Sequence, residues 1–299
     1  MRNDNSKFDL NRYVDILLKE GTIAKEEANL LIEIYYANDG KSKKFKCKEC
    51  GKCCESISKS TKRQCLKNYN KNIETSLILF LPYNKAGFCI FPWEVKNLKR
   101  LAGTLGITLE FTPLYGYLSA ESNLILNASY TFNSNRCHFL SEDKRCLIYE
   151  ERPQFCKGFP VIHSGLLTDY FLIGNCPRKI SESSKPLRMS LKDRIMKSYS
   201  DYGVVYLDAI KTEILIIETM KLVKLAQDSG NIKLTRISSH DMIDFISYEK
   251  KDIVDYSLEE GIISEETLNS IIQNIKRMNI AELLIWLIQE NKSPVELDI

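Results

Sequence analysis

The feature that most constrains this chain is a run of closely spaced cysteines, Phe45-Lys-Cys47-Lys-Glu-Cys50-Gly-Lys-Cys53-Cys54. Two residues between cysteines let a tight turn aim both sulfurs at one centre, and Gly51 permits the positive φ that such a turn needs. Thiolates suit zinc or iron–sulfur clusters and are poor ligands for calcium or magnesium. The segment is therefore predicted to be a loop folded around a metal.

A second set of cysteines follows at Cys137, Cys146, Cys156 and Cys176. Cys137 and Cys146 flank a predicted hairpin, residues 137–149 with its turn at 141–144, so we expect them to face each other. The eight thiols of the two sets fit two four-thiolate sites, or one cluster with spare ligands. His138 and His163 lie near the second set and are alternative ligands.

The adjacent pair Cys53-Cys54 bears on how the ligands are shared. Neighbouring side chains diverge, so we expect one of the two to join Cys47 and Cys50 while the other serves a second centre. Cys65 and Cys89 stand outside both sets and are interpreted as free buried thiols.

The identity of the metal stays open between an iron–sulfur cluster and zinc. The spacing Cys47-x2-Cys50-x2-Cys53 is that of a ferredoxin-type cluster, and Cys176-Pro177 fits the remote cysteine-proline ligand of such clusters. A metal that only stabilises a loop-rich domain is an equally open interpretation. Arg152 and Lys157 are candidate cofactor-binding residues, because their charge and N–H groups would stabilise bound thiolates. A surface arginine beside a rigid turn is the alternative for Arg152.

The two cysteine sets carry a family resemblance. The run Cys47 to Cys54 resembles the opening of the CxxCxxCC zinc- or iron-chelating domain, the YkgJ-like cysteine cluster proteins. The later segments Cys137-His-Phe-Leu, Cys146-Leu-Ile-Tyr149, Arg152-Pro153 and Cys156-x-Gly-Phe-Pro160 are similar to the second block of that family. The resemblance covers about Phe45 to Cys176 and implies metal binding by cysteines. One branch, the flagellin lysine-N-methylases, uses S-adenosylmethionine, so the resemblance also implies protein lysine methyl transfer as an alternative.

Charge and hydropathy limit the other classes of function. Residues 241–299 carry 13 acidic and 5 basic side chains, which favours a protein partner or homo-oligomer formed through the helical regions. The basic stretch 41–63 has little aromatic interleaving, so we do not expect nucleic-acid binding.

The apolar runs are too short for a membrane span, and the N-terminus has no apolar signal region. We therefore expect a cytoplasmic, reducing location, where disulfides are disfavoured. The motifs G-x-G-x-x-G, G-K-[ST], H-E-x-x-H and G-x-S-x-G are absent.

The predicted fold class is α+β, with three parts: a helical hairpin (1–40), a metal-organised cysteine-rich domain with a few short strands (41–185), and an all-helical C-terminal region (186–299). Hydrophobic spacing predicts two helices within 8–36, separated at Gly21, and a helix after Pro92. It predicts strands at 76–81 and 123–132. Residues 187–226 are predicted to form one helix, or two joined near Gly203. Shorter helices are predicted at 241–258, 265–278 and 281–288.

Overall fold

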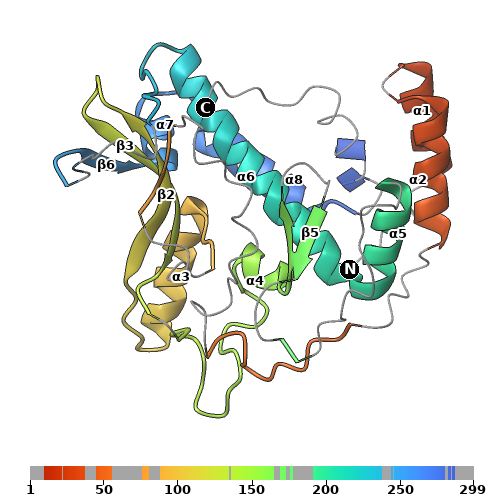
Figure 1. The fold of residues 1–299 in the computed structure, drawn as a ribbon, viewed down its shortest axis with the longest axis horizontal. Helices are drawn as coiled ribbons and strands as arrows, with labels where there is room; N and C mark the ends of the chain where they lie inside the picture. Colours follow the sequence, from red (N-terminus) through yellow and green to blue (C-terminus); the bar gives the residue numbers. More distant parts are fainter. Residues whose placement is uncertain are drawn as a thin grey trace.

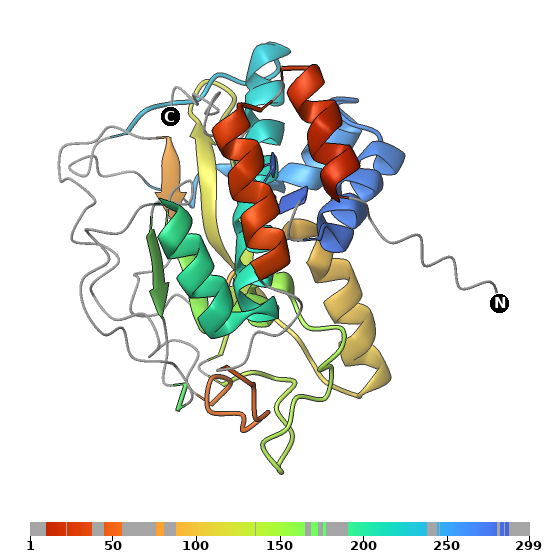
Figure 2. The same ribbon diagram turned by 90° about the vertical axis from the view of Figure 1, so that its right-hand side faces the viewer.

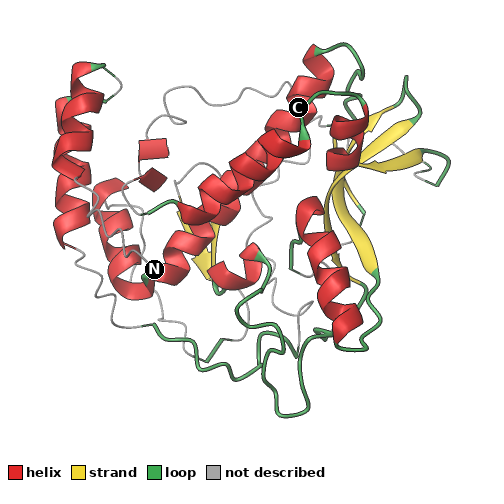
Figure 3. Ribbon diagram, turned by 180° about the vertical axis from the view of Figure 1, so that it is seen from behind, coloured by secondary structure: helices red, strands yellow, loops and turns green. Residues whose placement is uncertain are grey.

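The computed structural model describes residues 10–21, 23–37, 45–55, 76–80, 88–134, 136–164, 169–172, 176–177, 191–237, 244, 246–279, 282–283 and 285–286. In this part of the chain the helices are α1 (Leu10–Lys19), α2 (Lys25–Ala37), α3 (Pro92–Thr104), α4 (Gln154–Gly158), α5 (Leu191–Tyr202), α6 (Val204–Asp228), α7 (Ile253–Glu259) and α8 (Glu265–Arg277). The strands are β1 (Leu77–Leu79), β2 (Phe111–Ser119), β3 (Leu124–Phe132), β4 (Val161–Ser164), β5 (Asp169–Leu172) and β6 (Glu249–Asp252). Helices and strands are both substantial, so the fold is α+β (Figure 3).

The larger sheet has the order β1-β2-β3-β6. β1, β2 and β3 pair antiparallel, and β6 then pairs parallel with β3, so that Leu124 lies opposite Glu249 and Asn127 lies opposite Asp252. Because parallel pairing needs a long crossover, a segment distant in sequence completes this sheet. A second sheet consists of β4 and β5.

Helix α6 forms the centre of the molecule and runs diagonally between the sheet and the N-terminal helices (Figure 1). Its side chains Ile210, Ile214, Leu215 and Val223 are fully buried. Such a helix, apolar on most of its circumference, is stable only when other elements cover it on several sides. Helices α4, α5, α7 and α8 all pack on it.

The N-terminal helices contribute to the same core. Val14 and Leu17 of α1 share a hydrophobic cluster with Ile210 and Ile214 of α6 and with Ile275 of α8. In Figure 2, α1 and α2 are the two red helices on the near side of the molecule. Residues from all three predicted parts therefore meet in one core, and the division into 1–40, 41–185 and 186–299 stays a prediction.

Most of the predicted helices and strands are confirmed. The two N-terminal helices, the helix starting at Pro92 and the strands at 77–79 and 124–132 lie where hydrophobic spacing predicted them. Of the stretch predicted as one or two helices, the structure describes residues from 191 on, and these form two helices, α5 and α6, which meet at Gly203. The predicted hairpin at 137–149 has its turn, in which the Lys144 N–H donates to the Ser141 carbonyl, but its arms share only the isolated bridge Leu140–Cys146.

The prediction of an all-helical C-terminal region is wrong. Residues 249–252, Glu-Lys-Lys-Asp, form β6 within the stretch predicted as the helix 241–258, of which α7 is the helical part that the structure describes. Strand β2 was also missing from the predicted elements. Within the described residues, each helix is too short or too polar to cross a membrane.

Candidate metal centre

The first cysteine block is a compact turn whose shape depends on Gly51. Gly51 has a φ of +68°, and a Cβ there would lie 2.8 Å from Leu140 Cδ1 and closer still to the Lys144 carbonyl oxygen. Any larger residue would therefore be strained and would collide with the second block. The Glu49 N–H donates to Cys47 Sγ at 3.4 Å, so this thiol is already an acceptor of a backbone hydrogen bond.

Short contacts hold the first block to the rest of the molecule. The Phe45 N–H donates to the Asp201 carbonyl of α5 at 3.0 Å, and the Phe45 ring lies 5.5 Å from the ring of Tyr202. The Cys137 N–H donates to the Cys54 carbonyl at 2.8 Å, which joins the two cysteine blocks directly.

Helix α4 brings Cys156 to the same place. The Gln154 N–H donates to Glu94 Oε1 at 2.8 Å, and the Gln154 side chain donates to the Asp208 carbonyl on α6 at 3.0 Å. A Cβ on Gly158 would lie 2.8 Å from Ala209 Cα, so only glycine permits this close approach of α4 to α6. The position of Cys156 is therefore fixed by the packed core beneath it.

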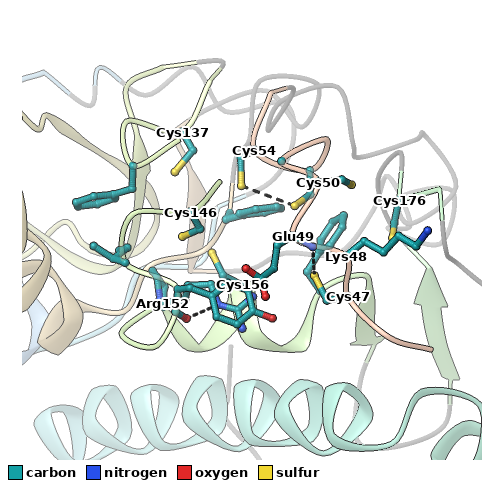
Figure 4. Close-up of a pocket in the computed structure, with 18 of the residues that line it drawn as sticks. Cys47, Lys48, Glu49, Cys50, Cys54, Cys137, Cys146, Arg152, Cys156 and Cys176 are labelled. Carbon is teal, nitrogen blue, oxygen red and sulfur yellow. Dashed lines mark hydrogen bonds between the residues drawn. The ribbon is translucent and has the colours of Figure 1, made fainter. Parts of the chain in front are cut away.

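All eight predicted metal ligands line one pocket (Figure 4). They are Cys47, Cys50, Cys53, Cys54, Cys137, Cys146, Cys156 and Cys176. Aromatic and aliphatic side chains form much of the remaining wall: Phe45, Phe88, Phe132, Phe139, Ile148 and Phe159. Sequence reasoning did not identify this apolar wall, because its members are spread over five separate segments.

The sulfurs of Cys53 and Cys54 lie 3.7 Å apart. The expectation that these adjacent thiols diverge is wrong, because the turn at Gly51 directs both into the same space. Among the described residues, no three cysteine, histidine or acidic side chains yet converge as a bound ion requires.

The pKa values of several thiols are raised, because the pocket holds too little positive charge to stabilise their thiolate forms. Hydrogen bonding with Cys137, together with burial, raises the pKa of Cys54 to about 12. Burial raises the pKa of Cys146 and, more strongly, that of Cys156, while the positive charge of Arg152 acts in the opposite direction on both. A metal cation would reverse these shifts, since it stabilises thiolates far more than one arginine does. The donor set and its surroundings thus fit a thiolate-bound metal.

The two candidate cofactor-binding residues differ in position. Arg152 lines the pocket, stacks 3.6 Å above the ring centre of Tyr149 and donates to the Tyr149 carbonyl at 2.7 Å. Lys157 lies next to Cys156 on α4, and successive residues of a helix point in different directions. It lines a separate polar cavity with Glu94 and Lys276, and its charge acts on Glu94.

The remaining candidates lie outside the pocket or outside the described residues. His138 is half-buried beside Phe132, with ring centres 5.9 Å apart, and is not part of the pocket wall. Cys89 is buried elsewhere, as expected of a free thiol. The backbone of His163 belongs to β4, and its side chain is outside the described residues, as are Cys65 and His240.

Residues 46–176 match the CxxCxxCC family. The family is described as "Putative zinc- or iron-chelating domain". The matched CxxCxxCC segment contains both cysteine blocks and all eight thiols that line the pocket. A comparison with curated proteins and one with solved structures found no match.

Proposed function

We propose that this protein coordinates an iron–sulfur cluster or zinc in the cysteine pocket, with a redox or cluster-handling role if the metal is iron, and that it works in the reducing cytoplasm. The observation that carries the proposal is the gathering of eight thiols, from four separate segments, around one apolar pocket. The match of residues 46–176 to a zinc- or iron-chelating family supports the same chemistry. The nine cysteines of the described part are all free thiols, as a reducing compartment requires.

The surrounding residues have defined tasks in this proposal. The phenylalanine wall excludes water, which strengthens every charge interaction inside the pocket. Arg152 places a positive charge beside Cys146 and Cys156, and its stacking on Tyr149 keeps the guanidinium in place. A bound iron–sulfur cluster would supply one-electron transfer, whereas zinc would supply charge and cross-linking without redox chemistry.

The test is metal and sulfide analysis, with a visible spectrum, of protein purified without oxygen. Iron with acid-labile sulfide and a brown colour would establish a cluster, and stoichiometric zinc in colourless protein would establish a thiolate zinc site. Cys89→Ser is the matched control, because this thiol lies outside the pocket and its loss should leave the metal content unchanged. Wild-type protein that retains neither metal under these conditions would overturn the proposal.

A further inference from the structure

The eight thiols of the pocket differ in their exposure to solvent. Cys47 and Cys50 are exposed, and we call them the outer thiols. Five others are partly buried and belong to the two blocks that contact each other; we call Cys53, Cys54, Cys137, Cys146 and Cys156 the inner thiols. Cys176 is also partly buried, and we count it neither with the outer nor with the inner thiols.

The inner thiols form a group by contact as well as by burial. The sulfurs of Cys53 and Cys54 are 3.7 Å apart, and the Cys137 N–H is bonded to the Cys54 carbonyl at 2.8 Å. Four of the five pack against the hydrophobic cluster that contains Phe88, Phe139 and Phe159. In Figure 4, Cys54, Cys137, Cys146 and Cys156 are drawn on one side of the pocket.

The outer thiols occupy the solvent-facing side of the same pocket. Cys47 is drawn apart from the inner group, next to Lys48 (Figure 4). Its sulfur accepts the local N–H of Glu49 and also has a side-chain hydrogen bond with Tyr149. Neither outer thiol packs against a hydrophobic cluster of the described residues. The spacing of two residues between Cys47 and Cys50 still allows both to bind one ion.

An ion cannot cross the apolar wall of this pocket without ligands, because moving a bare charge out of water costs many kcal/mol. It can move through the pocket if each bond that it loses to one thiolate is replaced by a bond to another thiolate. The outer thiols are the most exposed members of the set, and the inner thiols are only partly exposed in the same pocket.

We propose that Cys47 and Cys50 are the entry site, which receives a soft metal ion such as Zn²⁺ or Fe²⁺ and passes it to the inner thiols. This inference rests on the proposed metal-binding function. In the transfer the ion keeps its oxidation state. Each bond that forms to an inner sulfur releases that thiol's proton, and each outer thiolate that lets go of the ion takes up a proton from water.

The experiment uses the full-length, metal-free, reduced protein and Zn²⁺ alone as the probe. The double variant Cys47→Ser/Cys50→Ser is compared with Cys146→Ser/Cys156→Ser and with wild type, by equilibrium zinc stoichiometry and by the rate of zinc uptake from a chromogenic chelator. The outer variant should keep the zinc of the inner site but load it at least about tenfold more slowly. The inner variant should lose the tightly bound zinc.

Three results decide between the explanations. Uptake by the outer variant at the wild-type rate would overturn the entry-site proposal, and so would loss of its zinc to the same extent as in the inner variant. Wild-type protein that binds no zinc and no iron would instead overturn the proposed function. Lys48→Ala is the matched control for the outer loop, since it changes an exposed neighbour without removing a thiol. The single variants Cys47→Ser and Cys50→Ser alter exposed positions and should leave the fold intact. Each should also slow zinc uptake, and wild-type rates in both would overturn the entry-site proposal.

Discussion

The cysteine pocket and the sheet with α6 are held together by different kinds of contact. Around α6, side chains such as Ile210, Ile214 and Val223 are fully buried, and β2 and β3, each nine residues long, pair at eight positions. Residues 45–55 and 137–149, which carry six of the pocket thiols, are turns and loops, joined by single hydrogen bonds such as the one from the Cys137 N–H to the Cys54 carbonyl.

This difference shows where the protein depends on a ligand. Burial of apolar area, at roughly 25 cal/mol per Å², stabilises the region around α6 without help. The loop region around the thiols also buries apolar side chains such as Phe139 and Ile148, but its thiols are only half-buried and its backbone has little regular secondary structure. Metal bonds would therefore supply much of its order. The two regions meet at α4, which carries Cys156 on one side and packs on α6 with the other.

Removal of the metal should give the largest difference between the two regions. With a chelator under reducing conditions, we expect amide hydrogen exchange in residues 45–55 and 137–149 to accelerate by about a hundredfold or more, because the cross-links between the blocks are lost. Amides of β3 and α6 should change by less than about tenfold. Equal acceleration in both regions, measured by mass spectrometry, would show that they unfold as one unit.

The substitution Glu94→Ala should break the connection between α3 and α4. The Glu94 carboxylate accepts the Phe91 N–H at 3.0 Å and the Gln154 N–H at 2.8 Å, and its loss leaves both donors unpaired. We expect the free energy of unfolding to fall by about 3 kcal/mol. Glu151→Ala, which removes an exposed ion pair with Arg100, is the control and should cost less than about 0.5 kcal/mol. Urea unfolding measures both, and equal values would contradict this role of Glu94.

The metal affinity should rise with pH. The pKa of Cys54 is raised to about 12, and those of Cys53, Cys146 and Cys156 are also raised, so these thiols are protonated near neutrality and must release protons on binding. Between about pH 6 and about pH 8, the affinity should increase about tenfold per pH unit for each proton displaced. Competition with a chelator of known pH dependence measures this slope. A flat profile would mean that the ligands are already thiolates.

The smallest expected effect is that of Arg152→Met. This change removes the positive charge that lowers the pKa of Cys146 and Cys156 but keeps an apolar side chain over the Tyr149 ring. The metal affinity should fall by less than about tenfold. Arg100→Met, at an exposed position, should leave it unchanged. If the two variants bind metal equally well, Arg152 serves the fold and not the thiolates.

The sequence predicts the site better than it predicts the surroundings of the site. Spacing and residue type alone select the eight thiols that line the pocket, since few residues other than cysteine suit a soft metal. The pocket wall, and the position of Lys157 in a separate polar cavity, depend on how separate segments pack, and a local sequence pattern does not predict this. Strand β6 was missed for a related reason: Glu249, Lys250, Lys251 and Asp252 are too polar to resemble a strand, and they become one by pairing with β3.

The parallel pairing of β6 with β3 has a consequence for synthesis of the protein. The ribosome makes β3 and both cysteine blocks well before it makes β6, so the free edge of β3 stays open while the thiols are already available to metal. Metal can then be acquired by the nascent chain before the sheet is complete. In such an order of events, the supply of metal during translation would decide how much of the chain reaches its final fold.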